Sequence, residues 1–287
     1  MPGQYWKQVH ASGLEVPSDR PLDDLTAELT TMLGDTDPEA RDGTAYPTLA
    51  TWVGRGVYDD LLAGLGDGMA AGLGVGLGER DTDSVFRRSF SALVLGECIG
   101  RDNQRPLVAG GKVLEWGDRL ATWLLRERDL RGFVPGKGWA HAVAHGADAL
   151  GTLAQSPHVG ANELTVILDV IGDRLLLPVD RLFANGEPDR LAAATMHVLR
   201  RNLLPLRLVE PWIARLVAGA SVRGSYDDRD PHLVGGNAEA YLRALHLQLA
   251  LGPRPPEVRS DLLLVMVDAL RATNPDYLAT PRQQRSP

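Results

Sequence analysis

Apolar residues recur at intervals of three or four along most of this 287-residue chain. Leu22, Leu25, Leu29 and Leu33 set the pattern, which is typical of amphipathic α-helices. The same spacing predicts about ten or eleven helices, with no run of alternating residues that would favour strands, so the chain is expected to be all-α. The expected helices span residues 21–34, 37–53, 57–78, 83–101, 105–126, 140–152, 161–177, 187–201, 205–220, 234–251 and 257–272.

Successive helix pairs recur at about 40 to 50 residues, the spacing of two-helix repeats. We therefore expect an irregular α/α superhelix of antiparallel helix pairs, HEAT/armadillo-like, that forms one domain over residues 21–273. Residues 1–20 and 274–287 are polar and are expected to be a flexible leader and a flexible tail. A stack of this kind has a concave face suited to a partner or a ligand.

Residues 57–78 depart from the pattern because many glycines lie among the apolar residues. Each glycine weakens a helix by up to about 1 kcal/mol relative to alanine, but glycines also allow two helices to cross closely. Gly66, Gly68 and Ala71 partly match a dinucleotide-binding loop. Since no strand precedes them, we expect no nucleotide cofactor.

Composition and charge narrow the class of protein. Hydrophobic residues make up 44% and charged residues 23% of the chain, as in soluble globular proteins. The formal net charge of -7 argues against binding to nucleic acid or to an anionic membrane. Cys98 is the single cysteine, so neither an intrachain disulfide nor a cysteine zinc site is expected. No signal-like or membrane-length apolar run is present, and a cytoplasmic location is expected.

The candidate site lies where a charged loop, residues 126–138, leads into a segment with His141, His145 and Asp148. Positions i, i+4 and i+7 fall within about 60° of one another on an α-helix, so these side chains are expected to share one face. Small apolar residues occupy the opposite face. Ala142 stands where a metalloprotease HExxH helix has its glutamate, which argues against that class.

Two chemistries fit this triplet. Two imidazoles and a carboxylate can supply three ligands to a divalent metal, Zn, Mn or Fe, with a fourth position left for water. Alternatively, Asp148 can orient one histidine as a general base without a metal. Glu127 is expected to take part in catalysis or, like Asp129, to complete a coordination shell. A polar stripe that simply faces solvent explains the same pattern.

Cations in and near the loop suggest an anionic substrate. Arg131 and Lys137 are expected to bind a phosphate or a carboxylate, and Arg87 and Trp139 are further candidates for substrate binding. Residues elsewhere that could assist are Glu97, His197 and His246. For each of these, a surface ion pair or a satisfied core polar group is the alternative, and Trp139 could equally be a core anchor.

Three segments carry a family resemblance. VFRRSFSALVLGECIGRDN (85–103), ERDLRGFVPGKGWAHAVAHGADAL (127–150) and EPDRLAAATMHVLRR (187–201) resemble the domain-of-unknown-function-2785 family of bacterial proteins, with GWAHAVAHGAD the most specific block. The resemblance extends over most of residues 45–272. It implies an all-helical, repeat-like fold and brings no activity, substrate or cofactor.

Two functions therefore remain open. The first is an enzyme, either metal-dependent or metal-free, that hydrolyses a small anionic substrate at the His141, His145 and Asp148 face. The second is a non-enzymatic helical-repeat scaffold that binds a protein or peptide in its concave groove. The oligomeric state is not encoded in any of these patterns.

Overall fold

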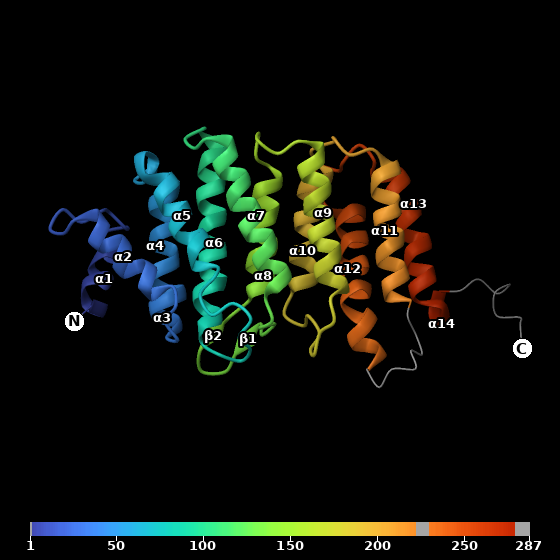
Figure 1. The fold of residues 1–287 in the computed structure, drawn as a ribbon, viewed down its shortest axis with the longest axis horizontal. Coiled ribbons are helices and arrows are strands. Elements are labelled where there is room, and N and C mark those ends of the chain that lie inside the picture. Colours follow the sequence, from blue (N-terminus) through green and yellow to red (C-terminus); the bar gives the residue numbers. More distant parts are fainter. Residues whose placement is uncertain (1, 222–229, 279–287) are drawn as a thin grey trace, which may run out of the picture. The chain divides into compact units, whose positions relative to one another are not determined.

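The computed structural model describes residues 2–221 and 230–278, and these are mostly helical (Figure 1). The all-α prediction is confirmed: within these residues the only strands are β1 (Phe133–Val134) and β2 (Gly138–Trp139), which form one short hairpin. No helix in the described part is long and apolar enough to cross a membrane.

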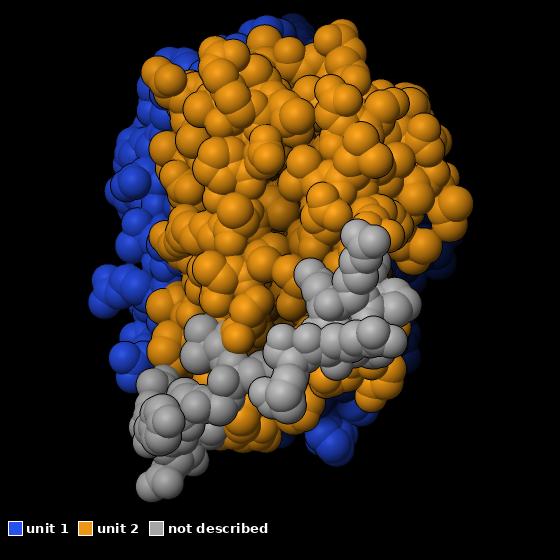
Figure 2. Space-filling view, turned by 90° about the vertical axis from the view of Figure 1, so that its right-hand side faces the viewer, with its two compact units in different colours: residues 1–158 blue, residues 159–287 orange. Residues whose placement is uncertain are grey.

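The chain divides into two compact units, Met1–His158 and Val159–Pro287, which Figure 2 shows in different colours. A compact unit need not fold on its own, so the single domain expected over residues 21–273 stays a prediction. In the first unit, the helical elements are α1 (Pro2–Ala11), α2 (Leu22–Met32), α3 (Pro38–Ala40), the π-helix η1 (Arg41–Ala45), α4 (Tyr46–Gly54), the 3₁₀ turn η2 (Asp59–Leu61), α5 (Leu62–Gly72), α6 (Ser84–Gln104), α7 (Gly110–Arg126) and α8 (Ala142–Ala154).

The two chain ends differ from the expected leader and tail. Residues 1–20 contain helix α1, whose Trp6 is 1% exposed and lies 6.3 Å from the ring of Trp52. Burial of this large side chain offsets the entropy lost when the segment is ordered. The residues around Trp6 are mostly polar, which is why the sequence pattern predicts a flexible leader. At the other end α14 (Pro275–Leu278) begins inside the expected tail, and residues 279–287 lie outside the described part.

Helix α6 is the centre of the first unit and packs against α4, α5 and α8. Its first turns contact the start of α8, where Ser89 meets Ala140, and its last turn contacts the end of α8, where Asn103 donates to the Thr152 carbonyl. The two helices therefore run parallel, and α7 is the return segment between them. This arrangement places the start of α6 beside the predicted histidines.

Part of the glycine-rich segment, Leu62–Gly72, forms helix α5, and two of its glycines lie at helix contacts. A Cβ on Gly66 would lie 2.2 Å from Cζ2 of Trp116 in α7, and one on Gly72 would lie 2.2 Å from the Ser91 hydroxyl in α6. These approaches are possible only because no side chain is present. The structure thus supports the helix-crossing interpretation of residues 57–78.

We expect Gly66→Ala to lower the free energy of unfolding by about 1–3 kcal/mol, because the added methyl group overpacks the contact with Trp116. Gly64 in the same helix is exposed and has open space around its Cβ position, so Gly64→Ala should instead raise stability by up to about 1 kcal/mol. Urea unfolding of both variants measures the difference. Equal stabilities would show that α5 and α7 are not in close contact.

The second unit consists of α9 (Ala161–Leu176), α10 (Glu187–Leu199), α11 (Leu206–Ala220), α12 (Pro231–Leu251), α13 (Arg259–Thr273) and α14. Buried polar contacts join its helices. The indole of Trp212 donates to the Leu168 carbonyl at 2.8 Å, and the hydroxyls of Thr195 and Tyr241 lie 2.6 Å apart. These bonds satisfy polar groups that would otherwise be costly inside the core.

Candidate functional site

His141 does not lie within the helix that the spacing predicts. Helix α8 begins at Ala142, and His141 precedes it in a left-handed conformation with φ 50° and ψ 33°. The cause is the β1–β2 hairpin, because its pairing continues beyond Trp139: Ala140 N–H donates to the Gly132 carbonyl and His141 N–H to that of Arg131. The expectation that three residues share one helix face was therefore wrong for His141.

A left-handed conformation costs a non-glycine residue roughly 1–2 kcal/mol. Strain of this kind concentrates at functional sites, where the surrounding structure holds the residue in place. Here the imidazole of His141 stacks on the indole of Trp139, with ring centroids 4.2 Å apart and planes at 20°. The ring of His145 lies 5.8 Å from that of His141, with the two planes at 80°.

His145 is 7% exposed and is held by a buried hydroxyl. Its Nδ1 lies 2.8 Å from Oγ of Ser89, and that same Oγ makes a short hydrogen bond to the Ala140 carbonyl. A carbonyl only accepts, so Ser89 must donate its single proton there and accept from Nδ1–H of His145. The neutral imidazole then carries its lone pair on Nε2, the nitrogen able to act as a base or a metal ligand.

The π-helix η1 supports the same region from the N-terminal side. Arg41 is fully buried, with its guanidinium 4.1 Å from the Phe86 ring, and it donates to the Asp35 carbonyl at 2.6 Å and the Lys137 carbonyl at 2.7 Å. Arg41 therefore ties the hairpin to η1. Single π-helical turns recur at functional sites.

Asp42 is a candidate that the sequence does not reveal. Burial raises the pKa of its carboxyl group, while Arg41, which donates to Oδ2 of Asp42 at 2.6 Å, opposes that rise, as does a smaller effect of His141. A partly buried carboxyl group with a raised pKa, next to an imidazole, is suited to act as a general acid. Residues 37–53 are predicted to be a helix that Pro47 can bend or split, and no local pattern marks the π-helical turn that positions Asp42.

Two further carboxylates extend this polar face across α6 and α8. Tyr46 donates its hydroxyl to Oε1 of Glu97 at 2.8 Å. A Cβ on Gly96 would lie 3.3 Å from the Cα of Ala149, so the adjacent residues Glu97 and Asp148 lie at the same level of the two parallel helices. Both side chains are partly exposed. We group these residues with the two histidines and refer to the set, Asp42, Tyr46, Glu97, His141, His145 and Asp148, as the histidine face.

Glu127, expected to be catalytic, is instead part of the core. It is 2% exposed, and its oxygens accept from Arg88 Nε at 2.6 Å and Arg88 Nη2 at 2.9 Å. The same carboxylate also accepts from the indole of Trp123 and from the backbone N–H groups of Arg128 and Asp129. These bonds engage both oxygens, so the contacts of Glu127 support a structural role and not catalysis.

The cations expected to bind an anionic substrate have partners inside the protein. Arg131 makes a two-pronged bond to Asp129, at 2.8 and 2.6 Å, and donates to the Thr82 carbonyl. Lys137 contacts both oxygens of Asp83, at 2.6 and 2.8 Å. Substrate binding by either cation would have to displace these bonds, and the predicted anionic substrate gains no support from them.

The remaining predicted residues lie apart from the histidine face. Arg87 leans against Gly34 and Gly72, and burial lowers its pKa. His197 and His246 belong to the unit Val159–Pro287. Burial, followed by the charge of Arg200, lowers the pKa of His197.

The metal prediction also lacks geometric support. Among residues 2–221 and 230–278, no group of three or more His, Cys, Asp and Glu side chains is placed to hold a metal ion. His141, His145 and Asp148 were expected to converge because they were expected on one helix, and His141 lies outside it. A Zn, Mn or Fe site at these residues stays a prediction.

The fold and the site thus define a helical protein with a buried, hydroxyl-supported histidine beside a strained one. A family model described as a protein of unknown function (DUF2785) matches residues 73–247, more than half of the chain, and the protein belongs to this family. The match includes the hairpin, His141, His145 and Asp148. No curated protein and no solved structure matches the chain.

Proposed function

We propose that the protein is a hydrolase that uses general acid–base catalysis at the histidine face. The observation that carries the proposal is the hydrogen-bonded series from the Ala140 carbonyl through Ser89 to Nδ1 of His145. It fixes the orientation of the ring and assigns the Nδ1 proton to the bond with Ser89, as the orienting group of a catalytic histidine does.

Two groups with different environments divide the proton transfers. His145 takes a proton from the attacking water through Nε2. Asp42, whose carboxyl pKa is raised by burial, donates a proton to the leaving group. Enzymes that catalyse hydrolysis near neutral pH commonly use two titratable groups whose environments give them different pKa values. Because Arg131 and Lys137 are already paired, the proposed substrate is uncharged.

A metal-dependent form of the same proposal differs in one respect. There His145 Nε2 would bind Zn, Mn or Fe, and the metal would activate the water. Both forms predict hydrolysis of an uncharged substrate, and a chelator separates them.

The test is hydrolysis of uncharged chromogenic esters, amides and glycosides by the full chain, purified without a histidine tag, before and after chelator treatment. We expect turnover of at least one class, unchanged by the chelator. Loss of turnover with recovery on addition of Zn, Mn or Fe would select the metal-dependent form. No turnover of any class would contradict the proposal.

We also propose that the helices form a HEAT/armadillo-like repeat stack and that the protein is cytoplasmic. The parallel packing of α6 on α8, with α7 as the return helix, supports the repeat. A single buried cysteine, Cys98, is compatible with a reducing compartment.

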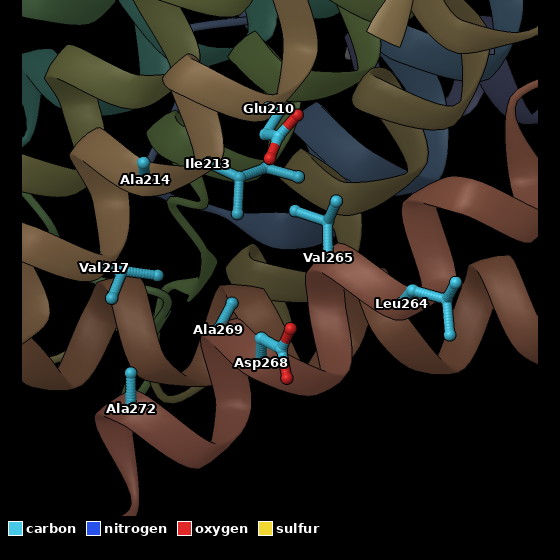
Figure 3. A pocket seen from close by; sticks show the side chains of 9 residues that line it. All are labelled: Glu210, Ile213, Ala214, Val217, Leu264, Val265, Asp268, Ala269 and Ala272. Carbon is cyan, nitrogen blue, oxygen red and sulfur yellow. The ribbon is translucent and has the colours of Figure 1, made fainter.

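One observation favours the scaffold function as a second candidate. In the second unit, α11 and α13 border an open groove of about 350 Å³. Figure 3 shows its apolar lining and the carboxylates of Glu210 and Asp268 along it. The lining is Ile213, Ala214, Val217, Leu264, Val265, Ala269 and Ala272. An amphipathic helix with lysines beside its apolar stripe fits both features.

A labelled model peptide of leucine and lysine tests this second candidate by fluorescence anisotropy. Leu264→Asp should abolish binding, because Leu264 lines the groove and is 69% exposed. The matched control is Val166→Asp, an exposed apolar position in α9. Equal binding by both variants would show that the groove is not the peptide site.

A further inference from the structure

Two aromatic side chains of the hairpin are exposed to solvent. Five of the six tryptophans are between 0% and 6% exposed, whereas Trp139 is 41% exposed. Phe133, its partner across the hairpin, is 52% exposed, and the two rings meet edge to face at 5.0 Å. Burial of such a side chain is worth about 1.5–3 kcal/mol, so exposed aromatic pairs often mark a binding surface.

The Trp139 ring is held rigidly at the edge of the histidine face. His141 stacks on one side of the indole, and Phe133 packs against it. The backbone beneath is fixed as well, because a Cβ on Gly138 would lie 3.0 Å from Pro38 and 3.1 Å from the Arg41 guanidinium. With one side of the indole covered and the residue 41% exposed, the other side offers a flat apolar surface to a ligand.

The cations around this surface have partners inside the protein. Arg41 donates to Oδ2 of Asp42 at 2.6 Å and to the carbonyls of Asp35 and Lys137, Lys137 pairs with Asp83 at 2.6 Å, and Arg131 pairs with Asp129 at 2.6 Å. None of these cations is left to neutralise a phosphate or carboxylate. The ligand that fits is therefore uncharged, has a flat apolar side, and carries hydroxyl groups at its rim for Asp42 and His141.

A pyranose ring has these properties, since its axial C–H groups form an apolar side and its hydroxyls project outward. We propose that Trp139, Asp42 and His141 form a subsite for an uncharged sugar ring. This inference rests on the proposed function and deepens it, because it names a glycoside as the substrate class. Sugar binding itself does not require His145, so binding and hydrolysis are separable.

A ligand can contact Trp139 directly, whereas the other five tryptophans are buried and contribute a constant background to the emission. Intrinsic fluorescence of the full chain is titrated with methyl glucoside, methyl galactoside, methyl mannoside, cellotriose and maltotriose, and with adenosine and uridine as uncharged aromatic ligands. We expect a saturable emission change with at least one sugar below about 10 mM, in the wild type and in His145→Gln alike. Calorimetry should then show binding weakened at least tenfold by Trp139→Leu and unchanged by Val166→Ala, an exposed apolar position in α9.

No emission change with any sugar at that concentration, or equal sugar affinity in Trp139→Leu, overturns the inference. A response to the nucleosides alone overturns it too, in favour of an aromatic ligand. Sugar binding without turnover would sustain this inference while the proposed function fails. Turnover of an ester or amide without sugar binding would support the proposed function and overturn this inference.

Discussion

His145→Gln lowers the rate of hydrolysis by about 10²- to 10⁴-fold, the usual contribution of a general base, and leaves the protein folded. A glutamine amide can still donate to Ser89 and fill most of the space, so the packing around Phe90 is retained. What it lacks is a basic nitrogen at the position of Nε2. The expected result is a fall in kcat with little change in KM, measured with the substrate class that the wild type hydrolyses.

The matched control is His158→Gln. His158 lies near Asp102, towards the opposite end of α6, with its Nε2 3.4 Å from the carboxylate. This variant should keep nearly full activity. If His145→Gln retains activity comparable with that of His158→Gln, His145 is a structural residue and the assignment of the base is wrong.

Glu127→Ala lowers the free energy of unfolding by about 3–5 kcal/mol, the cost of removing one partner from a buried ion pair. Arg88 and Glu127 both have side chains with 0% exposure, so the variant leaves a guanidinium in the core without its carboxylate. The backbone N–H groups of Arg128 and Asp129 lose their acceptor in the same step. Urea unfolding measures the effect, and the loop before the hairpin should lose protection from hydrogen exchange.

Glu115→Ala is the control for this prediction. Glu115 pairs with Arg119 and Lys112 on the surface of α7, with 42% of its side chain exposed, and exposed pairs contribute about 1 kcal/mol or less. The double variant Arg88→Met/Glu127→Leu should recover part of the stability, because it removes both charges. A loss in Glu127→Ala no larger than that in Glu115→Ala would mean that the pair is solvated.

Helical periodicity predicts the fold class well because buried positions recur every three or four residues within each helix. Leu25 and Leu29 are fully buried in α2, as their spacing requires, and α6 and α7 lie close to the predicted 83–101 and 105–126. The same reasoning fails at His141. The strands of the hairpin have two residues each, too few to produce an alternating pattern in the sequence, and Gly136 and Gly138 between and within them have positive φ. The pairing of these strands nevertheless sets where α8 begins.

The candidate site is only partly predictable for a related reason. His145 is identified by its spacing, but its partner Ser89 lies 56 residues away, and only the parallel packing of α6 on α8 brings the two together. Asp42 is missed because no local pattern marks η1, whose Arg41 contacts Phe86 and the hairpin, both distant in sequence. Glu127 shows the opposite error: its charge suggests chemistry, while Arg88, distant in sequence, neutralises it inside the core.

The protonation state of His145 tests the central claim most directly. Long-range ¹H–¹⁵N correlation spectra of the imidazole distinguish a protonated ring nitrogen from one with a lone pair. We predict that, in the neutral ring of the wild type, Nδ1 carries the proton and Nε2 the lone pair, and that Ser89→Ala removes this preference. A neutral His145 with its proton on Nε2 in the wild type would contradict the account, because the nitrogen assigned as the base would have no lone pair.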